Sequence, residues 1–120
     1  MILVDTSVWV DHLRVGNERL KSLLLDEQVL CHPFIFGELA CGSLRNRSEI
    51  LGLIQSLPHA THAEHEEVLY LIDARKLYGQ GLGWIDAHLL ASALLTDVWL
   101  WTLDQPLEKA ASSLKISYSI

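Results

Sequence analysis

The sequence lacks any apolar run long enough to cross a membrane. Such a run needs about 18 or more mostly apolar residues, and no stretch of the 120 residues reaches that length. The chain starts at Met1 without the basic segment of a signal peptide. We therefore expect a cytoplasmic protein that does not associate with membranes.

Cysteine is also scarce, with only Cys31 and Cys41 in the chain. No further Cys/His pair accompanies them, which excludes the usual structural zinc patterns. Both lie among apolar residues, so we expect buried free thiols in a reducing compartment rather than a disulfide.

Basic residues are outnumbered, nine Lys and Arg against 15 Asp and Glu, and the formal net charge is −6. At face value, this charge argues against a nucleic-acid partner, which usually meets a basic face. That argument weakens if several acids surround a cation. The basic residues that do cluster are Arg45 with Arg47 and Arg75 with Lys76. They could form solvated helix faces, or they could be the only basic surface available to bind a phosphate backbone.

Half of the residues are hydrophobic, enough for one core in a single domain over residues 1–120 without repeats or linkers. Strand-like apolar runs alternate with helical periodicity, which predicts an α/β fold, a mostly parallel sheet between two helical layers. The expected strands are 2–5, 28–32, 60–62, 98–102 and 116–120. The expected helices are 7–14, 18–25, 33–42, 46–56, 63–78, 84–95 and 107–114.

Asp5 stands where the first predicted strand ends, and Thr6 and Ser7 after it are typical of a helix cap. Open parallel sheets bind ligands at the carboxyl ends of their strands. A charge among apolar residues is costly without a partner. Asp5 is therefore the first candidate site residue.

Three further acids also lie among apolar residues: Glu38, Asp86 and Asp104. Each has a local explanation. Asp86 could complement a helix dipole, Asp104 could cap the next helix, and Glu38 could pair with Arg45. Asp5 could likewise cap its own helix. Four such acids together are harder to explain locally.

Clustered carboxylates must protonate or hold a cation, because charges about 4 Å apart repel by about 4 kcal/mol at an effective dielectric of about 20. Oxygen ligands suit Mg²⁺ or Mn²⁺, which serve phosphoryl chemistry. His62 and His65 lack the other ligands of a zinc site. We expect His88 in the core or supporting the site.

These residues resemble a known family. The segments Ile2-Leu3-Val4-Asp5-Thr6-Ser7-Val8-Trp9, Glu38 after Pro33, Asp86-Ala87-His88 and Trp101-Thr102-Leu103-Asp104 are similar to PIN-domain ribonucleases, especially VapC-type toxins of bacterial toxin–antitoxin pairs. The resemblance spans essentially the whole chain. It implies a three-layer α/β/α fold, an endoribonuclease dependent on Mg²⁺ or Mn²⁺, a homodimer, and a cognate VapB-type antitoxin whose tail covers the active site.

The resemblance also implies residue roles. Asp5, Glu38, Asp86 and Asp104 correspond to the family's acidic quartet, with Asp5, Asp86 and Asp104 as metal ligands and Glu38 acting through water. The hydroxyls that would hold these carboxylates are those of Thr6, Ser7 and Thr102. Gln105 departs from the basic residue that many relatives carry there. We expect a small, structured RNA target.

Other interpretations remain. A haloacid-dehalogenase-type phosphatase needs a second Asp where Ser7 stands, and a receiver domain needs its acceptor later than Asp5. A housekeeping nuclease or a non-catalytic PIN-like module is also possible. Most of the four Trp residues should anchor the core or a dimer interface, and one exposed near Asp5 or Asp86 could stack a base.

Overall fold

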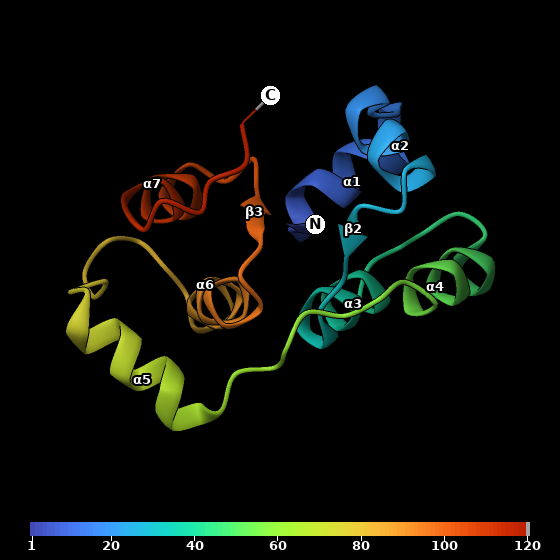
Figure 1. Ribbon diagram of the computed structural model, residues 1–120. Helices are drawn as coiled ribbons and strands as arrows, with labels where there is room; N and C mark the ends of the chain where they lie inside the picture. Colours follow the sequence, from blue (N-terminus) through green and yellow to red (C-terminus); the bar gives the residue numbers. More distant parts are fainter. Residues whose placement is uncertain (120) are drawn as a thin grey trace.

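The structure, a computed structural model that describes residues 1–119, is organised around a parallel three-stranded sheet (Figure 1). The strand order is β2-β1-β3, so the first strand of the chain lies at the centre. Leu3 pairs with Leu30 on one side and with Leu100 on the other. The strands are β1 (Ile2–Val4), β2 (Val29–Leu30) and β3 (Trp99–Trp101).

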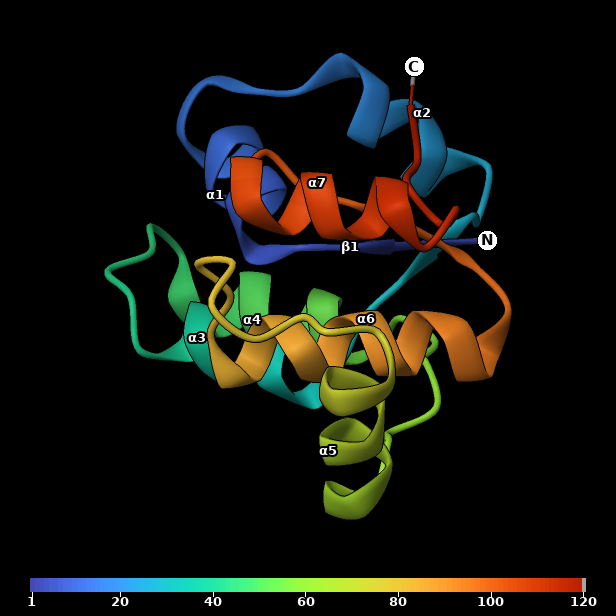
Figure 2. The same cartoon turned by 90° about the vertical axis from the view of Figure 1, so that its left-hand side faces the viewer.

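Within residues 1–119, seven helices surround this sheet. Figure 2 shows α1, α2 and α7 on one face and α3, α4 and α6 on the other, with α5 packed outside α6. The predicted three-layer α/β/α fold is therefore confirmed. The helices are α1 (Thr6–Val15), α2 (Glu18–Leu25), α3 (Pro33–Ala40), α4 (Arg47–Gln55), α5 (His65–Ala74), α6 (Trp84–Thr96) and α7 (Gln105–Ser113).

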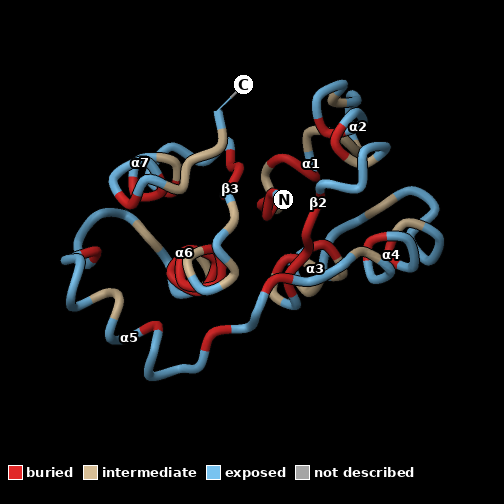
Figure 3. The backbone as a smooth tube through the Cα atoms, viewed as in Figure 1, coloured by how far each residue is buried: buried red, intermediate tan, exposed pale blue. Residues whose placement is uncertain are grey.

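The core lies on both faces of the sheet (Figure 3). All three residues of β1 are buried, as expected for a strand covered by helices on both faces. Helix α6 is buried from Ala87 to Ala93, which confirms the predicted buried helix. It packs against β3 on one side and α5 on the other, and Asp86 near its start is half-buried.

Two predicted strands are wrong as strands. Residues 60–62 are irregular, and one parallel bridge joins Cys31 to His59. The segment after residue 115 makes one parallel bridge, between Leu100 and Ser117, and residue 120 lies outside the described part. Each of these two segments forms a single β-bridge at an edge of the sheet, which is too short to count as a strand.

Several predicted helix ends are also wrong. Helix α5 covers less than 63–78 because Glu64 lies at its N-cap and Lys76 adopts a left-handed conformation after its end. Helix α1 starts at Thr6, so Thr6 and Ser7 lie inside the helix and Asp5 occupies the N-cap position. Helix α7 starts at Gln105, two residues earlier than predicted.

The two thiols differ in exposure. Cys31 is buried, as predicted, and burial raises the pKa of its thiol. Cys41 is exposed, contrary to the prediction, because it lies at the C-cap of α3. No helix in residues 1–119 is both long and apolar enough to span a bilayer.

Candidate active site

The four candidate acids come from different elements around one edge of the sheet. Asp5 and Asp104 follow β1 and β3, whose parallel pairing brings their carboxyl ends to the same edge. Asp86 lies in the first turn of α6, and Glu38 lies near the end of α3. The sheet topology thus gathers residues that are up to 99 positions apart in the sequence.

Asp5 is held by two hydroxyl groups. Its side chain makes no capping bond to α1 although it occupies the N-cap position. Instead, Oδ2 accepts hydrogen bonds from Ser7 Oγ at 2.8 Å and from Thr102 Oγ1 at 2.7 Å. Asp5 is only 7% exposed, so these charge-assisted bonds replace lost hydration. The second carboxylate oxygen, Oδ1, accepts no hydrogen bond from residues 1–119.

The same hydroxyls fix the segment that carries Asp104. Thr102 Oγ1 accepts the Asp104 N–H at 3.0 Å, and Ser7 Oγ accepts the Leu103 N–H at 2.9 Å. The backbone N–H of Asp5 also donates to Trp101 O at 2.9 Å. Asp5 and the backbone of Asp104 therefore belong to one hydrogen-bonded unit. The hydroxyls of Ser7 and Thr102 hold this unit together, and from the sequence they were predicted to do so only because of their positions.

Asp86 is electrostatically coupled to this unit. Burial raises the pKa of Asp86, and the charges of Asp5 and Asp104 raise it further, whereas the Gly83 N–H opposes the shift. That N–H donates to Asp86 Oδ2 at 3.0 Å. Three carboxylates from three elements are thus close enough for the charges of two to affect protonation of the third.

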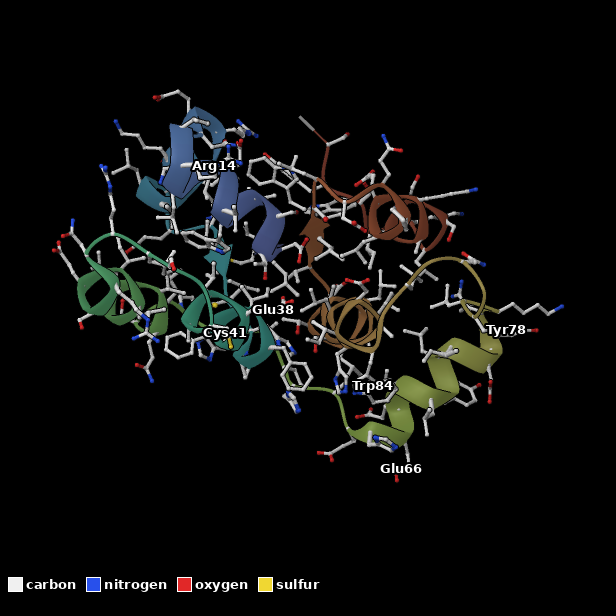
Figure 4. All side chains as sticks on the ribbon, turned by 180° about the vertical axis from the view of Figure 1, so that it is seen from behind. Arg14, Glu38, Cys41, Glu66, Tyr78 and Trp84 are labelled. Atoms are coloured by element: carbon white, nitrogen blue, oxygen red, sulfur yellow. The ribbon has the colours of Figure 1, made fainter. Side chains whose placement is uncertain are left out.

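Glu38 reaches the edge through Thr6. Thr6 Oγ1 donates to Glu38 Oε1 at 2.7 Å, which links the start of α1 to the end of α3. Thr6 therefore contacts Glu38 and makes no hydrogen bond to Asp5 among the described residues. Figure 4 shows Glu38 on the side of α3 that faces the middle of the molecule. The proposed pairing of Glu38 with Arg45 has no hydrogen bond to support it within residues 1–119.

Asp104 also has the local role considered from its sequence. It is the N-cap of α7, and its Oδ2 accepts the Leu107 N–H at 3.1 Å. This capping bond explains why α7 begins at Gln105. A capping role and a ligand role are compatible, because a carboxylate has two oxygens and the cap uses one.

The four candidate carboxylates have the right chemistry to bind a hard divalent cation, but they are not arranged around a single ion position. All four candidates offer carboxylate oxygens, the ligands that Mg²⁺ and Mn²⁺ prefer. Within residues 1–119, however, no three Asp, Glu, His or Cys side chains form a group that could hold one ion. Asp86 and Asp104 each have one oxygen held by a backbone N–H, and the other oxygen of each accepts no hydrogen bond within residues 1–119.

A groove of about 850 Å³ opens beside Glu38 and Thr6. Arg14, Arg45 and Asn46 line it, together with apolar residues of α1 and α4. Two guanidinium groups thus lie in a groove that also contains a candidate site carboxylate. In an acidic chain, this groove is a plausible place for a phosphate to meet positive charge.

A cluster of aromatic and imidazole rings surrounds His88, two positions after Asp86, and its extent was missed from the sequence. Its members come from the start of α3 and its N-cap, from α6, and from the irregular segment before α5 together with the first residue of α5. His88 was expected in the core or beside the site, and it is 4% exposed. The cluster consists of His32, Phe34, His62, His65, Trp84 and His88. The sequence signal was the number of His and Trp residues near Asp86.

Comparison with known proteins identifies related chains. The family model described as the PIN domain matches residues 2–112. Ribonuclease VapC32 from two strains of Mycobacterium tuberculosis is 47% identical to this chain over 113 residues. The similarity covers 93% of this chain and 91% of each relative.

Proposed function

The chain belongs to the PIN-domain family, and we propose that it is a metal-dependent endoribonuclease, the toxic component of a toxin–antitoxin pair. The similarity to ribonuclease VapC32 supports this function over nearly the full length. We further propose that residues 1–120 form a single nuclease domain. The matched residues 2–112 include all four candidate acids.

The observation that carries the proposal is the coupling of Asp5, Asp86 and Asp104. Asp5 is buried and anchored by Ser7 and Thr102, and its charge and that of Asp104 raise the pKa of Asp86. Three like charges at one sheet edge are unfavourable unless a proton or a cation compensates them. A cation held at this edge would suit metal-assisted phosphodiester cleavage.

Asp5, Asp86 and Asp104 would hold Mg²⁺ or Mn²⁺, which would polarise a phosphate oxygen and lower the pKa of a bound water. Thr102 and Ser7 orient the Asp5 carboxylate, so that its Oδ1 faces away from the hydroxyls. Glu38, fixed by Thr6, would orient or activate the attacking water. Arg14 and Arg45 would bind the RNA backbone in the groove.

The proposed partners follow from the same family. We expect a VapB-type antitoxin, and an RNA target implies action in the cytoplasm. We also propose a homodimer, since large apolar side chains such as Tyr70 and Leu95 are exposed. A sedimentation mass equal to one 13.5 kDa chain at micromolar concentration would contradict the dimer.

The test is RNA cleavage by the pure protein and by Asp5→Asn. We expect the wild type to cleave with added Mg²⁺ or Mn²⁺, to lose cleavage in EDTA, and to recover when either metal is restored. Asp5→Asn should lose at least about 1000-fold in rate, because removal of a ligand disables metal-assisted chemistry. Its circular dichroism should match that of the wild type, because the shape of the side chain is kept.

The matched control is Asp73→Asn, which removes one exposed carboxylate from the outer helix α5. It changes the net charge equally and should cleave normally. Equal loss in both variants, or cleavage that persists in EDTA, would contradict the assigned site.

One observation favours a non-catalytic PIN-like module instead. The carboxylates of residues 1–119 do not form a ready-made group for one ion. If wild type and Asp5→Asn are equally inert with both metals and no antitoxin, the binding-module alternative holds. Growth arrest on induction of the chain alone would distinguish a toxin from a housekeeping nuclease.

A further inference from the structure

The ring cluster beside Asp86 forms a continuous series of contacts. The His62 and His88 rings stack with centroids 5.4 Å apart and an interplanar angle of 26°. Trp84 meets His88 edge-on at 4.8 Å and lies 5.0 Å from His65. Phe34 contacts His88 at 4.8 Å and thereby joins the cluster to α3.

The series runs from the core to the surface. His88 is 4% exposed, whereas Trp84 is 40% exposed, and His62 and His65 are also exposed. Trp84, at the first position of α6, lies between the start of this helix and α5 in Figure 4. A rigid indole supported from behind by buried rings is thus open to solvent on its outer side. Such a surface can stack a flat ligand without first ordering itself.

The position of the cluster connects it to the carboxylates. Trp84 and Asp86 both lie in the first turn of α6, but they are two positions apart, so their side chains lie on different faces of the helix. On α3, Phe34 and Glu38 are four residues apart, so they lie on one side of that helix. The contact between Phe34 and His88 therefore joins the two helices that carry Asp86 and Glu38.

Packing alone explains the cluster poorly. The His88 Nδ1 atom is buried and has no hydrogen-bond partner among residues 1–119. An unpaired buried polar atom destabilises a fold, so an apolar side chain would pack more favourably there. Large exposed aromatic groups are likewise typical of recognition surfaces rather than of solvated helix ends.

The charge of the chain indicates which part of a nucleic acid such a surface would meet. The chain has a net charge of −6 and two Arg residues line the groove, so little positive charge is available for phosphate contacts. Stacking of unpaired bases on aromatic side chains does not need positive charge. The exposed rings therefore fit the bases of single-stranded RNA better than its backbone.

We propose that Trp84, with His65 beside it and His88 behind it, is a stacking platform for an unpaired nucleobase that flanks the cleavage site on the α5 side of α6. The proposal rests on the proposed ribonuclease function and specifies how its substrate is held. It makes Trp84 a substrate-binding residue and selects unpaired segments, such as loops, over duplex RNA.

The test compares Trp84→Leu with Trp99→Leu. Trp99 is 50% exposed but begins β3, at the opposite end of that strand from Asp104, so it is a matched control. For a single-stranded RNA oligonucleotide, Trp84→Leu should raise KM about 10-fold with kcat within twofold, and Trp99→Leu should change neither. Trp84→Phe, which keeps an aromatic face, should recover most of the affinity.

A binding measurement separates stacking from a structural role. Fluorescence anisotropy in EDTA, where no cleavage is expected, should show an about 10-fold higher Kd of Trp84→Leu for the RNA. An otherwise identical oligonucleotide with abasic sites should bind wild type and Trp84→Leu equally. If Trp84→Leu fails to fold, the same comparison is made between Trp84→Phe and Trp84→His, which both keep a ring at this position.

The outcomes differ for the two proposals. Equal Kd values of Trp84→Leu and Trp99→Leu, or an equal loss for abasic RNA, would overturn the platform while leaving the nuclease intact. Base-dependent binding lost in Trp84→Leu, together with no cleavage by wild type in either metal, would overturn the nuclease and keep the platform.

Discussion

At the scale of single residues, the buried carboxylate of Asp5 is the most constrained group of the site. Two hydroxyls donate to one of its oxygens, and each of these hydroxyls also accepts a backbone N–H from the segment after β3. Charge-assisted bonds of this kind are stronger than neutral ones. Ser7 and Thr102 therefore both orient Asp5 and connect the first strand to the last.

Thr102→Val tests this connection. The substitution keeps the side-chain shape at a residue that is 4% exposed, but it removes the donor to Asp5 and the acceptor of the Asp104 N–H. We expect activity to fall about 10- to 100-fold, as for other groups that support metal ligands. The free energy of unfolding should fall by about 1–3 kcal/mol. Cleavage assays and urea titration measure the two effects.

The control for this variant is Thr102→Ser, which keeps the hydroxyl and should retain most of the activity. If Thr102→Ser and Thr102→Val lose activity equally, the hydroxyl is not what orients Asp5, and the methyl group of Thr102 matters instead.

At the scale of elements, the start of α3 depends on an unusual cap. His32, which is fully buried, accepts the Phe34 N–H at its Nδ1 (3.0 Å). Its Nε2 lies 3.1 Å from Ser92 Oγ on α6, so the neutral ring joins the two helices. Burial, and to a smaller extent the charges of His62, His88 and His59, lower the pKa of His32 to about 4.

This cap predicts acid sensitivity of the fold. The pKa of His32 falls from 6.5 in the unfolded chain to about 4 in the folded chain, so only the unfolded chain binds the proton between these values. The stabilisation is complete above pH 6.5 and is lost as the pH falls toward 4. The loss should amount to no more than about 3–4 kcal/mol, because the pKa falls from 6.5 to about 4 and one pKa unit corresponds to about 1.4 kcal/mol.

Urea unfolding of wild type and His32→Asn between pH 7 and pH 4 measures the effect. Asn can still cap the helix but does not titrate, so the stability of His32→Asn should fall less steeply over this range. Parallel stability curves for the two proteins would contradict the assignment to His32.

At the scale of the whole molecule, the shortage of positive charge limits how RNA can be bound. The chain carries a net charge of −6, and the groove beside Glu38 contains Arg14 and Arg45. A footprint with few phosphate contacts releases few counterions. We therefore expect recognition to come from the shape and exposed bases of the target, in line with the prediction of a small, structured RNA.

The salt dependence of binding tests this limit. With two phosphate contacts, the logarithm of the binding constant should fall with a slope of about −1.4 against the logarithm of salt concentration. Arg45→Gln should reduce the slope by about 0.7, whereas Arg75→Gln, at the end of α5 and outside the groove, should not change it. Anisotropy titrations with RNA in EDTA give these slopes.

A slope several times steeper would indicate a basic surface other than this groove. Comparable cleavage of unrelated RNAs at matched salt would contradict recognition of a small, structured target.

Much of the fold was predictable because its signals are local. The apolar runs gave the positions of β1 and β3, and the continuous apolar segment gave the buried helix α6. Helix ends were less predictable, because several neighbouring residues can each occupy the N-cap position. Either Thr6 or Ser7 could have capped α1, but the chain uses Asp5 at that position, and Glu64 shortened α5.

The sequence by itself determined which side chains could do chemistry: carboxylates at strand and helix ends, hydroxyls beside them, and rings near Asp86. Only the tertiary structure decided their partners, because those contacts join residues far apart in the chain. Thr6 contacts Glu38 rather than Asp5, and Thr102 contacts Asp5 across two neighbouring strands. Trp84 became a surface residue because α5 and the segment before it leave one side of its ring open. Local patterns fix residue type and periodicity, whereas strand order and helix packing fix which groups meet.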